Sequence, residues 1–221
     1  MCGRYGLHIE PSQIAKKYSI HSTLPEIVSH YNITPRSENP VICETHGKRE
    51  LVTMTWGLLP PFVKDQTKAI RPINVRLETI AQKPIFRDSF QSRRCIVPAT
   101  EYYEWKVVRG LKQPYRIFSK NNAILSLAGI FDTWIFENTR VVSYAIVTAT
   151  PVKSLSHIHD RMPLVLSDNS QNVWLSEKSS TERVLAISSG NCSQELESYE
   201  ISPLVNNPKN DIPQIIQKKQ T

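Results

Sequence analysis

Alternation of apolar and polar residues runs through much of the chain and predicts a series of β-strands. The alternation is cleanest at 141–148, and it continues with aromatic side chains at 102–107. Successive side chains of a strand point to opposite faces, so each stretch fits a strand with one buried face. Residues 41–44 and 50–55 flank His46-Gly47, which predicts a hairpin. Shorter apolar runs predict further strands at 5–9, 95–97, 114–118, 123–136, 164–166 and 201–205.

Apolar residues four positions apart predict helices between these strands. Ile14 and Tyr18 show this spacing, and Phe86 and Phe90 repeat it. Two more helices are expected, one after Ser167 as its N-cap and one at 181–187. No internal repeat, linker or change of composition divides the chain. We therefore expect a single α+β domain over residues 1–213, with a mobile C-terminal tail at 214–221.

Composition places the chain among ordinary globular proteins and excludes several classes. Of its 221 residues 40% are hydrophobic and 21% are charged. No apolar run reaches the ~18 residues of a membrane span, and the first twenty residues lack the pattern of a secretory signal. We expect a cytoplasmic protein without a membrane partner. The net charge of +7 favours a polyanionic partner, although a merely basic protein would carry the same charge.

The cysteines indicate neither a disulfide framework nor a metal site. They stand at Cys2, Cys43, Cys95 and Cys192, far apart and without a C-x-x-C pair. In a reducing compartment they are expected to be free thiols. His157 and His159 are two residues apart, but no third ligand follows at a suitable spacing. The sequence therefore predicts no metal.

Cys2 is a candidate nucleophile because it directly follows the initiator methionine. Removal of Met1 would leave a free amine and a thiol on one residue. Their reference pKa values are about 7.7–8.0 and about 8.5, so both would be partly deprotonated near neutrality. Such an aminothiol can form an imine with an aldehyde and then close to a thiazolidine. The alternative is a functionless, frayed terminus.

Four other side chains stand out as candidates for chemistry or binding, each with a structural alternative. Asn74 can donate and accept hydrogen bonds at a site, or it can cap a helix. Glu104 lies within an aromatic strand, where it is either a paired inward carboxylate or solvent-exposed. His159 can transfer protons near neutrality, or it can be structural. Trp56 precedes a Gly- and Pro-containing loop and is either exposed for binding or part of the core.

Motifs along nearly the whole chain resemble those of the SOS response-associated peptidase family. The matching stretches are Met1-Cys2-Gly3-Arg4-Tyr5, Tyr31-Asn32-Ile33-Thr34-Pro35, Trp56-Gly57-Leu58-Leu59-Pro60, Ile73-Asn74-Val75-Arg76-Leu77-Glu78-Thr79, Arg93-Arg94-Cys95-Ile96-Val97-Pro98, Tyr103-Glu104-Trp105-Lys106, Ile158-His159-Asp160-Arg161-Met162-Pro163 and Val205-Asn206. The chain departs from the family pattern at Val75 and Leu77, at Glu101, where Gly is frequent, and at Arg36-Ser37 after Pro35. These departures concern loop shape and DNA-sequence tolerance and leave each candidate catalytic group in place.

The resemblance implies a mixed α+β fold, with mixed and antiparallel sheets, a small barrel-like core and flanking helices. It also implies that Cys2 is the nucleophile, assisted by Asn74, Glu104 and His159. The expected activity is covalent capture of abasic sites in single-stranded DNA as a thiazolidine, with weak lyase activity by β-elimination and self-removal of Met1. No cofactor is needed.

The same resemblance suggests which residues contact DNA. Arg4, Arg76 and Arg161 are expected on phosphates, and Trp56 and Phe62 on bases. The partner would be single-stranded DNA with abasic sites, bound by a monomer in the cytoplasm and associated with the nucleoid when on DNA. Two alternatives remain open. One is a cysteine peptidase, in which His159, Glu104 and Asn74 assist Cys2. The other is a non-covalent reader of modified bases.

Overall fold

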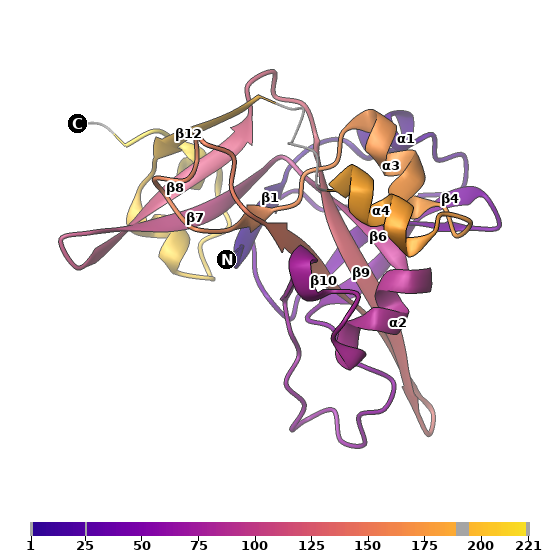
Figure 1. The fold of residues 1–221 in the computed structure, drawn as a ribbon. Helices are drawn as coiled ribbons and strands as arrows, with labels where there is room; N and C mark the ends of the chain where they lie inside the picture. The colour runs from indigo at the N-terminus through magenta and orange to yellow at the C-terminus, as the bar shows by residue number, and fades with distance from the viewer. Residues whose placement is uncertain (1, 25, 189–194, 220–221) are drawn as a thin grey trace.

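The computed structural model describes residues 2–24, 26–188 and 195–219 and shows one α+β domain (Figure 1). Within these residues the helices are α1 (Pro11–Tyr18), α2 (Pro84–Ser92), α3 (Asp168–Leu175) and α4 (Thr181–Ser188), with short 3-10 turns η1 (Leu77–Thr79), η2 (Pro203–Asn206) and η3 (Pro213–Ile216). The strands are β1 (Arg4–Leu7), β2 (His30–Ile33), β3 (Glu38–Thr45), β4 (Lys48–Trp56), β5 (Asn74–Arg76), β6 (Arg94–Ala99), β7 (Glu101–Val108), β8 (Leu111–Ser119), β9 (Leu125–Phe136), β10 (Thr139–Ala149), β11 (Met162–Pro163) and β12 (Leu196–Glu200). The α+β class expected from the sequence is confirmed.

The larger sheet closes on itself and forms the barrel-like core that the resemblance implied. Its strands pair in the order β11-β10-β4-β3-β6-β9, and β9 pairs again with β10. The ring is therefore β10, β4, β3, β6 and β9, and closure leaves these strands without free edges. β5 and β11 extend the ring at β10, through Ile146 opposite Asn74 and Thr148 opposite Pro163.

The second sheet lies beside the barrel and carries the N-terminal strand (Figure 1). Its order is β12-β8-β7-β1-β2, with Arg4 opposite Tyr103 and Tyr5 opposite Tyr102. Side chains of this sheet, such as Tyr5 and Ile117, belong to the same hydrophobic cluster as the barrel strands. The two sheets therefore share a core, and β1 stands where they meet.

The helices α2 and α3 are fixed to the barrel partly through one buried arginine. Arg94, at the start of β6, donates to the carbonyl oxygens of Phe90, Gln91, Trp174 and Ser176 at 2.6–2.8 Å. These carbonyls lie at helix ends, where helical hydrogen bonds leave acceptors unsatisfied. Ser167 caps α3 as predicted, because its side chain accepts from the backbone N–H of Ser170.

The C-terminal segment differs from the expectation. Residues 201–205, expected as a strand, instead follow β12 and contain an isolated bridge at Ile201 and most of the turn η2. Residues from Gln214 to Lys219, which the sequence suggested as a mobile tail, pack against the second sheet. Ile215 is buried in a small cluster with Tyr103, Ile201 and Val205. Most residues around Ile215 are polar, so local composition did not predict this packing.

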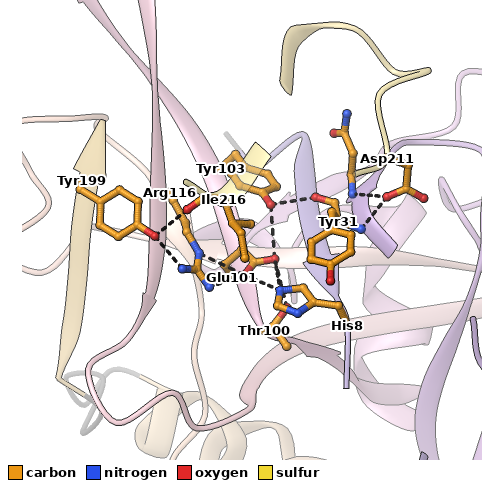
Figure 2. A network of polar contacts seen from close by, with 10 residues as sticks. His8, Tyr31, Thr100, Glu101, Tyr103, Arg116, Tyr199, Asp211 and Ile216 are labelled. Atoms are coloured by element: carbon orange, nitrogen blue, oxygen red, sulfur yellow. Dashed lines mark hydrogen bonds and ion pairs between the residues drawn. The ribbon is translucent and has the colours of Figure 1, made fainter. Parts of the chain in front are cut away.

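A buried carboxylate holds the second sheet together (Figure 2). Glu101 accepts hydrogen bonds from Arg116 at 2.7 and 3.1 Å and lies 3.0 Å from Nε2 of His8. Burial acts to raise the pKa of Glu101, but the bonds and charges of His8 and Arg116 outweigh it and hold the pKa below its ordinary value. A Cβ on Gly6 would lie 1.8 Å from Oε1 of Glu101, so the carboxylate occupies the space that only a glycine leaves open.

Candidate active site at the junction of the two sheets

Cys2 lies at the start of β1, between the second sheet and β5 of the barrel. Its side chain has no solvent-exposed surface. The backbone carbonyl of Cys2 accepts a hydrogen bond from Nδ2 of Asn74 at 2.7 Å, and the thiol donates to the carbonyl of Arg4 at 3.7 Å. Cys2 is therefore a packed residue held from both sheets, unlike the frayed terminus that was the alternative.

Asn74 is the first residue of β5, and its amide is directed at Cys2. It does not cap the following turn, whose N-cap position is Arg76. Its Oδ1 atom is buried and accepts no hydrogen bond from the described part of the chain. A buried acceptor left unsatisfied is costly, so it is available to a donor that enters the site.

The environment of Cys2 keeps its thiol protonated. Burial and the nearby negative charge of Glu104 raise the pKa of the thiol, while the positive charge of the amino terminus acts in the opposite direction. This holds for the chain with Met1 in place, whereas the partly deprotonated thiol was expected for the chain that begins at Cys2. A reaction at sulfur needs a partner that takes the thiol proton.

Glu104 is such a partner, because it is buried beside Cys2 and titrates near neutrality. It lies on β7 with 3% of its surface exposed, so the solvent-facing alternative is wrong. Burial raises its pKa to about 7, against the lowering effect of the positively charged amino terminus. A carboxyl group with this pKa can both accept and donate a proton at pH 7.

His159 stands in the loop between β10 and β11, with its side chain 28% exposed. Its Nδ1 lies 3.0 Å from the backbone N of Arg161 and accepts from that N–H when the neutral ring carries its proton on Nε2. Burial and the charges of the amino terminus and Arg161 lower its pKa, while Asp160 raises it. Protonation of Nδ1 would allow it to donate to Asp160, whose Oδ1 is 2.7 Å away.

The loop that carries His159 is fixed by Arg161. Its guanidinium binds both carboxylate oxygens of Glu78 at 2.7 and 2.9 Å and donates to the carbonyl of Thr148 at 2.6 Å. Arg4 is engaged in a similar way, with Asn32 and with the carbonyl of Val205, both at 2.9 Å. Both arginines were expected on DNA phosphates. In the structure Nη1 of Arg4 and both terminal nitrogens of Arg161 bind protein acceptors, and Nε of Arg161 donates to no described residue.

Trp56 is a core residue, and its expected role in base stacking is wrong for this structure. Its side chain is fully buried and donates from Nε1 to the carbonyl of Ile73 at 2.9 Å. It packs edge-to-face on Tyr5 with ring centroids 5.2 Å apart. By contrast, Phe62 is 66% exposed and Arg76 is exposed, so both remain accessible to a ligand.

A groove of about 670 Å³ opens beside Glu104 and His159. Its other lining residues are Trp105, Lys106, Val107, Lys112, His157, Ile158 and Asn206. The lysines of this groove were not foreseen as ligand contacts. The strand pattern could have suggested them, since Lys106 continues the same strand two residues beyond Glu104. The basic side chains make the groove suitable for an anionic ligand.

The structure also bears on the expectations about metals, membranes and thiols. No cluster of His, Cys, Asp and Glu within residues 2–24, 26–188 and 195–219 could hold a metal ion. Among the same residues, no helix is long and apolar enough to cross a membrane. Cys2, Cys43 and Cys95 are free and buried, whereas Cys192 and Met1 lie outside the described residues.

Fold and site together define a single-domain α+β protein in which a buried cysteine near the start of the chain lies beside an amide and a carboxyl group, and the carboxyl group shares a groove with an imidazole. The family model for SOS response associated peptidase (SRAP) matches residues 1–208, and the chain belongs to that family. The abasic site processing protein YoqW of Bacillus subtilis is 35% identical and aligns over 98% of this chain and 99% of its own length.

More distant relatives agree with this assignment. The abasic site processing protein HMCES of Rattus norvegicus is 28% identical over 98% of this chain and 75% of its own. A crystal structure of a protein from Bacteroides thetaiotaomicron, 26% identical, matches with a TM-score of 0.88 and covers 99% of this chain and 100% of that chain. The fold is thus shared along the whole length.

Proposed function

We propose that this protein processes abasic sites in single-stranded DNA by covalent capture on Cys2. The observation that carries the proposal is the position of Cys2. Its carbonyl is bound by Asn74, and its thiol lies near enough to Glu104, a carboxyl group with a pKa of about 7, to feel its charge. The names of the relatives at up to 35% identity support abasic sites as the target. Removal of Met1, by the protein itself, would place the reactive amine on Cys2.

The first step opens the sugar. An abasic deoxyribose is mostly a closed hemiacetal, and its C1′ aldehyde is exposed only when the ring opens. When the ring of His159 is protonated, its Nε2 can donate a proton to the sugar ring oxygen while the C1′ hydroxyl loses its proton to water, which leaves His159 as a neutral imidazole. His159 is half-buried and lines the groove, a position that suits contact with the sugar.

Capture then needs proton transfers that Glu104 can perform. The Cys2 amine adds to C1′ and gives a carbinolamine, which loses its hydroxyl as water when the protonated Glu104 donates. The product is an imine. The Cys2 thiol adds across it, with sulfur bonding to C1′ and the thiol proton passing to nitrogen through Glu104. The net result is a thiazolidine and one released water, and Asn74 maintains the orientation throughout.

The same imine explains a weak lyase activity. The positive imine nitrogen acidifies the C2′ proton, and the ionised Glu104 can remove it. The electron pair then forms a C2′–C3′ double bond and expels the 3′ phosphate. Ring closure by the thiol competes with this elimination, so cleavage is expected to be the minor outcome.

The DNA contacts follow from exposure and charge. Arg76 and Phe62 are exposed and free to meet a phosphate and a base. The lysines of the groove extend this surface. The protein would act as a monomer in the cytoplasm, associated with the nucleoid when bound to DNA.

Intact-mass spectrometry tests the proposal directly. The protein is mixed with a single-stranded oligonucleotide that carries one abasic site. The expected product has the mass of the chain without Met1 plus the oligonucleotide minus one water. Cys2→Ala is the control and gives no adduct. An adduct of equal yield on Cys2→Ala, or on a chain that retains Met1, contradicts the aminothiol mechanism. Binding without any adduct would favour the non-covalent reader.

A further inference from the structure

Two arginines from distant parts of the sequence flank Gly57, at the end of β4. A Cβ on Gly57 would lie 3.4 Å from Cβ of Arg71 and 3.6 Å from Cδ of Arg36. These are ordinary contact distances, so both arginines lie directly beside Gly57, and it is the φ of 127° that favours glycine at this position. Arg36 precedes β3 and Arg71 precedes β5, so the fold alone brings them together.

The pair has positive charge without a balancing carboxylate. Among the described residues, no ion pair involves either arginine. Nη2 of Arg71 donates to Gln66 at 2.9 Å, but its Nε is buried and donates to no described residue. Burial and then the charge of Arg36 lower the pKa of Arg71, as expected for neighbouring like charges. An anion between the two guanidinium groups would balance their positive charge and accept a hydrogen bond from Nε of Arg71.

The arginine pair is connected to the residues that hold the proposed nucleophile through a few backbone contacts. The backbone N–H of Arg36 donates to the carbonyl of Trp56 at 2.8 Å, and the ring of Trp56 donates to the carbonyl of Ile73. Ile73 directly precedes Asn74, which binds Cys2. Arg71 and Asn74 are three residues apart, a span of at most about 11 Å. A strand joined at Cys2 therefore has nearby phosphates within reach of the pair.

We propose that Arg36 and Arg71 form a clamp for one phosphodiester of the DNA strand whose abasic residue is at Cys2. The proposal rests on the proposed function and adds a subsite to it. Guanidinium groups bind phosphate oxygens through paired, charge-assisted hydrogen bonds. Nε of Arg71 has no acceptor among the described residues, so the pair retains a donor for a ligand.

The test removes charge from the protein and from the DNA in turn. The oligonucleotides carry a tetrahydrofuran analogue of the abasic site, which binds but cannot form an imine. Each has one uncharged methylphosphonate linkage at a different distance from the analogue. For the unaltered protein, a methylphosphonate at one of these positions is expected to lower DNA affinity about tenfold. This is the size of a lost charge-assisted hydrogen bond. Arg36→Ala/Arg71→Ala should lose a similar factor and become insensitive to that linkage.

Control variants separate the clamp from general charge and from folding. Arg183→Ala removes an exposed arginine of α4 and is expected to change neither affinity nor the linkage profile. Arg36→Ala alone alters only an exposed side chain, so it should show the same loss of sensitivity without a folding defect. The slope of affinity against salt should fall by about 0.7, because one phosphate of the single strand is no longer neutralised.

The outcomes are distinct. If both arginine variants keep the full linkage profile of the unaltered protein, the clamp is overturned, whatever the adduct yield on reactive abasic DNA. If inorganic phosphate binds at Arg71 but no methylphosphonate linkage lowers DNA affinity, the pair is a site for a free anion. The DNA clamp is then again overturned. Failure of the covalent adduct with an intact linkage effect would instead refute the proposed chemistry and leave the clamp standing.

Discussion

Replacement of Glu104 by glutamine tests whether this carboxyl group is held protonated by the fold. Its pKa is raised from 4.5 to about 7 by burial. A difference of this size corresponds to about 3 kcal/mol between the folded and unfolded states, at 1.36 kcal/mol for each pKa unit. Between pH 4.5 and 7 the unfolded chain has released the proton that the native chain still holds. The free energy of unfolding of the unaltered protein must therefore fall as pH rises through this window.

Glutamine carries no titrating proton and removes this dependence. We expect the difference in unfolding free energy, Glu104→Gln minus unaltered protein, to rise by about 3 kcal/mol from pH 4.5 to pH 7. Urea melts at several pH values, on chains with the same N-terminal processing, measure it. Glu26→Gln, at an exposed position, should show no such trend. If the melts of Glu104→Gln and the unaltered protein differ by a constant amount at every pH, Glu104 is not held protonated and its role as a neutral-pH acid is refuted.

Four further predictions follow from the other residues of the site. Cys2→Ala should lose the heat-stable adduct on a denaturing gel yet keep non-covalent affinity, and Cys2→Ser should trap less durably; an undiminished adduct in Cys2→Ala would show that another residue reacts. His159→Ala should slow capture of a closed abasic sugar by about 10²–10⁴-fold but slow reaction with a small open-chain aldehyde far less; equal slowing of both substrates would remove ring opening from its role. Trp56→Ala should cost about 3–5 kcal/mol of stability in a urea melt, because it empties a core position. Phe62→Ala should instead lower DNA affinity by about 1–3 kcal/mol. The reverse pattern would place Trp56 in the DNA path. Arg161→Ala should cost about 2–3 kcal/mol in unfolding free energy because its charge-assisted bonds are removed; an unchanged melt would show that its clamp on Glu78 is not stabilising.

Local patterns predicted most of the strands, because alternation reports directly which face is buried. The hairpin of β3 and β4 and the alternating strand β10 follow from that pattern alone. Alternation does not identify the strands that pair, so the closure of β9 onto β10 and the parallel pairing of β5 came from the resemblance or from the structure. The residues near Cys2 could be named by their motifs, but their burial and titration depend on the assembled sheets.

Charged residues were the least predictable, since their roles depend on partners far away in sequence. Arg161 binds Glu78, and Arg94 binds carbonyls at helix ends that no local pattern identifies as acceptors. Arg36 and Arg71 meet only through the turn at Gly57. The position of the aromatic residue Trp56 was equally hard to predict, because the loop after it suggested exposure whereas its ring is buried in the core.

The bonds of Arg4 and Tyr103 join the beginning of the chain to its end. Arg4 holds the carbonyl of Val205, and Tyr103 on the strand beside β1 packs with Ile215. The last described segment thus packs against the strand beside β1 and supports Cys2, which lies two residues before Arg4. A truncation at residue 213, which deletes nothing near the groove, would remove Ile215 and loosen the support of Cys2. Such a chain would keep every proposed catalytic group, and we expect it to capture aldehydes more slowly than the full chain.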